Sequence, residues 1–408
     1  MEPLNALPPP LDRVSVPRHL SVTRLANSGS CMLRAIADSS LSPKMPAGPE
    51  AEFGRVVHRL LELAAIGRIP ASSAEVAFDG LLNDAAEKLT RNDQTSMYAD
   101  LRVAFTRREW EKRRFLALER ARELANSIPF SPPGRRREFH PASLKEVFDR
   151  RKSSGTPEVA FRSDTLRIQG RIDFLRVETD RTIEISDFKS GDVFDDSGEV
   201  EESTAIQLQL YALAVLEVSS GARLELRVVS RGGSAHMKFD SDEQEGIREW
   251  LSRRTSVLSE GSLVRAEEVA VMGPQCRTCP VRVVCPNYRT SVAALWQTPF
   301  QGIPLPLDTA GRILEIETVP VGLLSLKLRD LAGRVVKIHR LKPRVVLSES
   351  FDHANMVWFF NAASNEPRMR KGMWRHPRNF HEVPDAPDDR TAWTLRVLRE
   401  VESVHEGS

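Results

Sequence analysis

The chain has 408 residues, of which 41% are hydrophobic and 28% are charged, and its formal net charge is +2. This length predicts two or three domains, and the composition is that of a globular protein rather than a disordered or fibrous one. No stretch approaches the roughly 20 apolar residues of a membrane-spanning helix, and the proline-rich start lacks the apolar core of a secretory signal. We therefore expect a cytoplasmic protein that has no membrane partner.

In chain order, residues 1–18 are expected to be a flexible lead-in, and residues 19–36 a short helix that carries Cys31. An amphipathic helix is predicted from about Glu52 to Ile66. A helical insertion follows at about 72–140, because apolar residues recur there at helical spacing with few breakers. The stretch 101–153 holds 15 Lys/Arg against 7 Asp/Glu, and it includes Arg135, Arg136 and Arg137 in a row. These arginines are candidates for binding a phosphate backbone, although a solvated helix face would look the same.

The middle of the chain changes character near Pro157. Three short strands are predicted in PEVAFRSD, LRIQGRIDFLRVE and RTIEISDFKSG. A helix is expected in STAIQLQLYALAVLEV, then a strand in LELRVVS and a helix in DEQEGIREWLSRRTSVL. This alternation predicts an α/β fold with a mixed sheet flanked by helices.

A linker is expected at residues 296–310, followed by a β-rich domain at 311–388 and a short helix with a tail at 389–408. The alternating apolar pattern of 311–361 predicts a small barrel-like sheet that could resemble an OB-fold. Aromatic and basic residues occur together in this region, and stacking on bases with cations along the backbone is typical of single-strand binding. The alternative is that the aromatic residues fill a core. The candidate DNA-binding residues here are Trp358, Arg370, Lys371 and Trp374.

Two carboxylates and a lysine follow adjacent predicted strands. Asp173 lies in GRID, and Asp187 and Lys189 lie in SDFKSG. Burying a carboxylate is unfavourable unless it is paired or bound to metal, and two converging carboxylates suit Mg²⁺. The carbonyl of Phe188 could add a ligand. Lys189 lies two residues after Asp187, on the same face of a strand, where it could stabilise charge on a reacting phosphate.

These motifs resemble those of the RecB-like PD-(D/E)XK nucleases. GRID, with DFKSG 14 residues later, resembles motifs II and III, and FGRVVHRLLE resembles the motif I helix. The resemblance implies a restriction-endonuclease-like core, His58 as a metal ligand, and Gln207 and Tyr211 of QLQLY beside the active site. Glu158 also fits the pattern. Imidazole as a ligand would tolerate Mn²⁺ as well as Mg²⁺.

The cysteines form a second motif, because Cys276, Cys279 and Cys285 lie within ten residues and Cys31 lies far upstream. This arrangement resembles the iron–sulfur staple of AddB-type nucleases and of CRISPR-associated RecB-like exonucleases, although Met32 stands where a proline is common. The resemblance implies a structural [4Fe-4S] cluster. A Cys₄ zinc site is the alternative.

Together these features predict a nuclease domain at 19–295 that cuts DNA with single-stranded character, as an exonuclease in repair, recombination or defence. The alternative is a non-catalytic DNA-binding or scaffold subunit of a nuclease–helicase complex. No G-x-x-x-x-G-K-[ST] loop is present, so a motor or defence-system subunit would be a separate partner.

Overall fold

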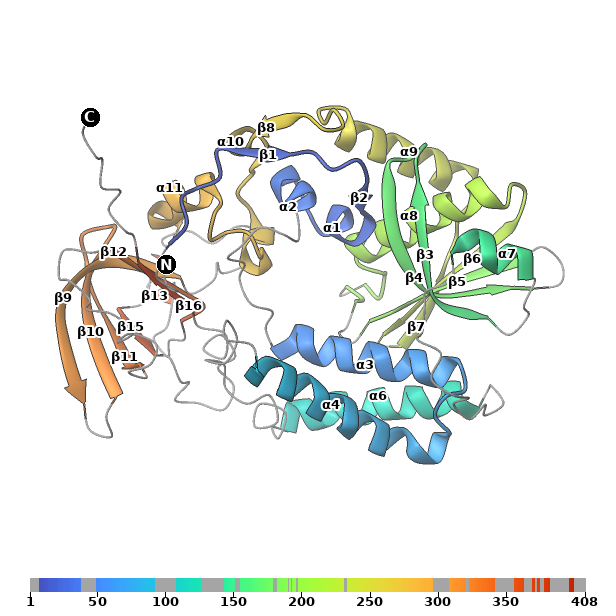
Figure 1. Cartoon of the computed structure of the whole chain (residues 1–408), viewed down its shortest axis with the longest axis horizontal. Coiled ribbons are helices and arrows are strands. Elements are labelled where there is room, and N and C mark those ends of the chain that lie inside the picture. The colour runs from blue at the N-terminus through green and yellow to red at the C-terminus, as the bar shows by residue number, and fades with distance from the viewer. Residues whose placement is uncertain are drawn as a thin grey trace.

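A computed structural model of the chain describes residues 7–37, 49–91, 108–126, 143–150, 155–178, 182–189, 191, 193–195, 197–230, 233–295, 308–319, 323–341, 356–362, 369–370, 373–374, 378–381 and 396–399. Figure 1 shows a helix-flanked central sheet on one side and a curved C-terminal sheet on the other, with α11 (Pro286–Leu295) between them. None of the described helices is both long enough and apolar enough to cross a membrane.

The central sheet is mixed, which agrees with the predicted α/β class. Its order is β2-β4-β5-β6-β7, and β3 pairs with the other edge of β4. The pairs β2–β4 and β5–β6 are parallel and the others are antiparallel. All seven residues of β5 are buried, as expected of a strand with both faces covered. The strands are β2 (Leu20–Ser21), β3 (Thr156–Ser163), β4 (Ile168–Val177), β5 (Thr182–Phe188), β6 (Arg223–Ser230) and β7 (Gly233–Met237).

Helix α8 (Glu202–Val218) and α9 (Ser241–Thr255) form where the sequence predicted them. Ten residues of α8 from Thr204 to Val215 are buried, because the helix packs between the sheet and its neighbours. Asp240 and Glu243 form a capping box that fixes the start of α9. The shorter helices around this core are α1 (Val22–Ala26), α2 (Met32–Ile36), α7 (Leu144–Arg150) and α10 (Ala266–Val269).

A second layer of three helices covers the other end of the sheet: α3 (Pro49–Ala65), α4 (Ala74–Arg91) and α6 (Arg108–Asn126), with the 3₁₀ turn η1 (Ala71–Ser73). Its apolar core includes Phe53, Phe78 and Trp110, and it continues into Phe174 and Phe188 of the sheet. The amphipathic helix and the helical insertion predicted from the sequence therefore act as one structural layer beside the sheet (Figure 1). Helix α3 of this layer carries His58.

The N-terminal segment differs from the expected flexible lead-in. Strand β1 (Arg13–Ser15) pairs with β8 (Leu263–Arg265), and Val14 and Val16 are buried. The amide of Leu11 donates to the carbonyl of Val284 at 2.9 Å. The prediction of flexibility was wrong for residues 7–18, because partners some 250 residues away in sequence order the segment, and local composition does not report them.

The C-terminal region forms a curled half-barrel. Its order is β15-β11-β10-β9-β12-β16, antiparallel except for β11 with β15. A strand at Arg396–Arg399 replaces the expected short helix, because it pairs with β12. The expected linker lies largely outside the described residues. The strands are β9 (Thr309–Val319), β10 (Leu323–Asp330), β11 (Val335–Leu341), β12 (Met356–Phe360), β15 (Asn379–His381) and β16 (Arg396–Arg399), with β13 (Met369–Arg370) and β14 (Met373–Trp374) as a separate pair.

The two faces of β12 belong to different cores. Val357 and Phe359 pack inside the half-barrel, whereas Trp358 and Phe360 join the core that includes α8 and the central sheet. The guanidinium of Arg289, on α11, lies 5.7 Å from the centre of the Trp358 ring. The half-barrel is therefore docked on the rest of the chain through an apolar face.

A buried polar network crosses the same junction. Arg282 is 3% exposed and donates from Nε to Oδ2 of Asp308 at 2.9 Å. Asp308 also accepts from the hydroxyl of Tyr288 at 2.6 Å and from the amide of Asn361 at 2.9 Å. Arg282 itself bonds the side chain of Asn361 and the carbonyl of Cys279. These contacts join the cysteine segment to the half-barrel.

Candidate active site

The two candidate aspartates lie where β4 and β5 separate. The antiparallel ladder between these strands joins Val177 to Ile183 and ends with Phe174 opposite Ser186. Asp173 and Asp187 are the next residues beyond that end, and they are 8% and 1% exposed. The amide of Phe188 donates to Oδ2 of Asp173 at 2.7 Å, which ties the two strand ends together. Two buried carboxylates thus meet at one break in the sheet.

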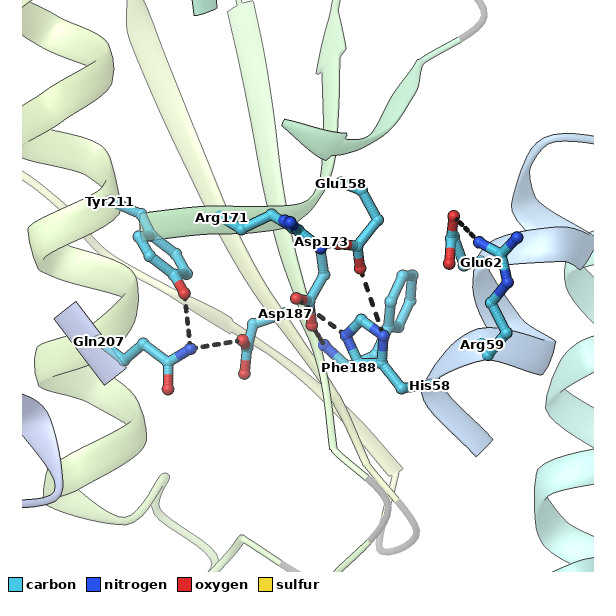
Figure 2. A network of polar contacts seen from close by, with 10 residues as sticks. All are labelled: His58, Arg59, Glu62, Glu158, Arg171, Asp173, Asp187, Phe188, Gln207 and Tyr211. Carbon is cyan, nitrogen blue, oxygen red and sulfur yellow. Dashed lines mark hydrogen bonds and ion pairs between the residues drawn. The ribbon is translucent and has the colours of Figure 1, made fainter. Parts of the chain in front are cut away.

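His58 reaches this break from α3 (Figure 2). Its Nε2 lies 2.9 Å from Oδ1 of Asp173, and its Nδ1 lies 3.4 Å from Oε1 of Glu158. One ligand atom from each of these three residues lies within 4.8 Å of the others. Two ligands that are each about 2.1 Å from one Mg²⁺ are at most about 4.2 Å apart. A small adjustment would therefore let all three residues bind one ion.

Glu158 has a left-handed backbone conformation, with φ 52°. Such a conformation costs about 1–3 kcal/mol in a residue that is not glycine, and it is concentrated at functional sites. Its buried carboxylate also accepts a bond from Nη1 of Arg171 at 2.8 Å. The family pattern in the sequence includes Glu158 but does not mark it as a ligand, and the structure places it directly against His58.

Lys189 and Asp187 are held by Gln207. Nζ of Lys189 lies 2.9 Å from Oδ2 of Asp187 and donates to Oε1 of Gln207, also at 2.9 Å. Nε2 of Gln207 donates to Oδ1 of Asp187 at 3.0 Å and to the Tyr211 hydroxyl at 2.9 Å (Figure 2). The amide of Lys189 bonds the carbonyl of Val229, which anchors the lysine to β6. The structure thus brings together six residues that the sequence singled out: Asp173, Asp187, Lys189, Gln207, Tyr211 and, through its contact with Asp173, His58.

Buried like charges shape the protonation of the metal-free site. Burial and the charge of Asp173 raise the pKa of Asp187, although Lys189 opposes the shift. Burial alone would lower the pKa of His58, but the hydrogen bond and charge of Asp173, with Glu158 and Asp187, raise it to about 9. Burial also raises the pKa of Glu158. Without metal the cluster retains protons that a divalent cation would replace.

The donor set fits a hard divalent cation. Imidazole and carboxylate ligands suit Mg²⁺ or Mn²⁺. Oδ2 of Asp187 is buried and makes no hydrogen bond of normal geometry with the described residues, although Lys189 lies beside it. No contact of the Phe188 carbonyl is established, so its role as a ligand stays a prediction.

Comparison with known protein families decides the family. The model of the PD-(D/E)XK nuclease superfamily matches residues 19–286, which is most of the chain. The chain belongs to the PD-(D/E)XK nuclease superfamily. This membership indicates a nuclease, and it agrees with the restriction-endonuclease-like arrangement of the mixed sheet and its helices. A search of curated proteins found no match.

The nuclease domain also brings the four cysteines into one region. All four are buried free thiols: Cys31 precedes α2, Cys276 lies in the 3₁₀ turn η2 (Pro274–Thr278), Cys279 ends that turn, and Cys285 precedes α11. Burial raises the pKa of Cys279 to about 11 and that of Cys285 to about 12, and the other three cysteines add to the shift of Cys285. The thiols are therefore close enough to interact electrostatically.

Among the predicted DNA-binding residues, the structure describes the surroundings of Trp358. Trp358 is 3% exposed and stacks on Phe360, so it belongs to the docking interface and is not available to stack on bases. Arg370 and Trp374 lie on β13 and β14, which pair with each other. Lys371 and the run Arg135, Arg136 and Arg137 lie outside the described residues.

Proposed function

We propose that this chain is a RecB-like exonuclease that hydrolyses phosphodiester bonds of DNA with Mg²⁺ or Mn²⁺, in repair, recombination or defence. The observation that carries the proposal is the convergence of Asp173, Asp187, Lys189 and His58 at one break in the sheet. An acidic pair with an adjacent lysine is the donor set that phosphodiester hydrolysis needs. The family membership supports the same reaction class.

In this proposal His58, Glu158, Asp173 and Asp187 hold the metal. When bound, the ion lowers the pKa of a water ligand and polarises the phosphoryl oxygen. Lys189 stabilises negative charge that develops on the reacting phosphate, because Gln207 holds its ammonium group beside Asp187. Tyr211 acts one step further away, since its hydroxyl fixes the amide of Gln207.

The test compares cleavage of labelled single- and double-stranded DNA, in linear and circular forms, with Mg²⁺ or Mn²⁺. Asp187→Ala and Lys189→Ala should lose activity by about 10²-fold or more, whereas the matched surface variants Glu249→Ala and Lys238→Ala should not. Cleavage of linear but not circular DNA supports an exonuclease. Equal cleavage by wild type and the site variants would refute the assignment, and binding without any cleavage would favour the scaffold alternative.

We further propose that the four cysteines bind a [4Fe-4S] cluster. Among the described residues, no three thiols lie within 4.8 Å of one another, whereas tetrahedral zinc with Zn–S bonds of about 2.3 Å needs sulfurs roughly 3.8 Å apart. The charges of Arg34 and Arg282 act on Cys276, and that of Arg254 acts on Cys31, so nearby cations can offset thiolate charge. The cations would offset the thiolate charge of either site, so the wider spacing of the thiols is what supports a cluster rather than zinc.

Anaerobic purification should give a brown protein with iron and sulfide in equal amounts, and Cys279→Ser should lose both. A colourless protein that contains one zinc per chain would contradict the cluster. The chain has no phosphate-binding loop of the helicase type. We therefore propose that strand separation, where it is needed, comes from a separate helicase or defence-system subunit.

A further inference from the structure

A large basic cleft lies beside the active site. It has a volume of about 1220 Å³ and is bounded by α1, α7, the β3–β4 hairpin and the C-terminal half of α8. This exceeds the roughly 300–1,000 Å³ of an ordinary small-molecule pocket. Among its described lining residues the only acidic one is Glu217, and the Lys/Arg residues are Arg13, Arg24, Lys145, Arg162 and Arg171. We call this space the basic cleft.

The basic cleft shares residues with the active site. Arg171 lines it and also donates to Glu158, which contacts His58. Figure 2 shows Arg171 beside Glu158 and Asp173. Phe161 lines the cleft as well, and its ring packs edge-on against Tyr211, with the ring centroids 5.7 Å apart. A ligand in the cleft would therefore lie next to the residues that surround the metal site.

Two cations of the cleft are free to take a ligand. The side chains of Arg162 and Lys145 are exposed, and neither forms a side-chain hydrogen bond or salt bridge with the other described residues, although the charge of Arg162 also acts on Asp164. The arginines of α6 differ, because Arg114 pairs with Asp79 and Arg120 pairs with Glu123. Exposed cations that gather around one cavity and outnumber the acidic residues that line it attract a polyanion.

The register of the β3–β4 hairpin places two of the arginines of the cleft one after the other along the strands. Ala160 lies opposite Arg171, and Arg162 lies opposite Gln169. Arg171 and Arg162 therefore sit on successive rows of one hairpin face, about 7 Å apart along the strands. This interval is comparable with the distance between successive phosphates of an extended strand, and it leads away from Glu158 and Asp173.

We propose that the basic cleft binds the sugar–phosphate backbone of a single nucleic-acid strand beyond the phosphate that is cut. The proposal rests on the proposed nuclease function, because the strand in the cleft is the same substrate. Arg171 contacts the phosphate nearest the metal site, and Arg162 and Lys145 contact phosphates further along. The contacts are to charge and not to base edges, so binding is independent of sequence.

The test measures binding of a fluorescent single-stranded oligonucleotide without divalent metal, so that no cleavage occurs. The double variant Lys145→Ala/Arg162→Ala should bind roughly tenfold more weakly at low salt, and its salt dependence should fall by about 1.4 in log–log slope, because each single-strand phosphate contact contributes about 0.7. The matched control Arg223→Ala/Arg248→Ala removes two exposed arginines outside the cleft and should bind like wild type.

Unchanged affinity and slope in the Lys145→Ala/Arg162→Ala variant would overturn the proposal. Equal affinity of the wild type for a duplex and a single strand would overturn the assignment to a single strand. Failure of the nuclease function has a different signature: the wild type would bind the oligonucleotide but cut nothing when Mg²⁺ or Mn²⁺ is added, and the double variant would still lose binding.

Discussion

Replacing Asp308 with asparagine should strongly destabilise the junction between the cysteine segment and the half-barrel. Asp308 and its partner Arg282 are 1% and 3% exposed, so neither charge is well solvated. Asparagine keeps the shape of the side chain, but it removes the charge that balances the guanidinium and it presents an NH₂ group to donors. Breaking a buried ion pair by removing one partner costs about 3–5 kcal/mol, and we expect a loss in that range in the free energy of unfolding.

Urea unfolding of the full chain measures this cost. A double-mutant cycle that combines Asp308→Asn with Arg282→Met gives the interaction energy of the pair itself. The double variant should be more stable than Asp308→Asn alone, because no unpaired charge remains buried. The matched control is Asp330→Asn, since Asp330 is also buried but pairs with the partly exposed Arg334 within its own turn. An Asp308→Asn cost below about 1 kcal/mol, the value of an exposed pair, would refute the reasoning.

Three further predictions concern the active site. Gln207→Leu should lower kcat by about 10–100-fold with little change in KM for a short substrate, because Gln207 is buried and orients Lys189; an unchanged kcat contradicts this. The raised pKa of His58 means that the folded metal-free protein binds more protons than the unfolded chain between about pH 6.5 and 9. The stability that protonated His58 contributes, at most about 3 kcal/mol, is present below pH 6.5 and is lost as the pH rises to 9. The pH dependence of stability in this window should therefore be weaker in His58→Gln than in the wild type. Gly170→Ala should destabilise by about 1–3 kcal/mol and reduce cleavage, because the added Cβ would lie 2.9 Å from the Phe161 ring and 3.2 Å from the Tyr211 ring; wild-type stability and activity would count against it.

The sequence predicted those elements in which apolar residues recur at the spacing of a helix or a strand, because that spacing indicates the buried face. The helix at 202–218 and the strand at 182–188 follow from apolar patterns, and the motif spacing identified the two aspartates and the lysine. It did not predict β1 or β16, because each is a short strand ordered by pairing with a distant partner. Such non-local pairing outweighs the local preference of a four-residue segment such as Arg396–Arg399.

Glu158 and Trp358 show that local sequence patterns do not predict which distant elements a side chain contacts. Glu158 lies near the start of β3, where a glutamate carries no local signal of function, and only the approach of α3 puts its carboxylate against His58. Trp358 was a candidate for stacking on DNA because aromatic and basic residues occur together in its region of the sequence. Alternation separates the two faces of a strand, but it does not say whether the second face meets water or another domain. For β12 both faces are buried.

The double burial of β12 bears on how the chain can be shortened. Trp358 and Phe360 cover apolar surface of the nuclease domain, and Asp308 balances the charge of Arg282. A protein that ends near residue 295 would expose that surface and leave the guanidinium without its carboxylate. We expect it to aggregate or to lose the fold around the cysteines, so its failure to bind DNA would report misfolding. The smallest unit that folds independently therefore extends at least through Asn361, well past the last residue that matches the family.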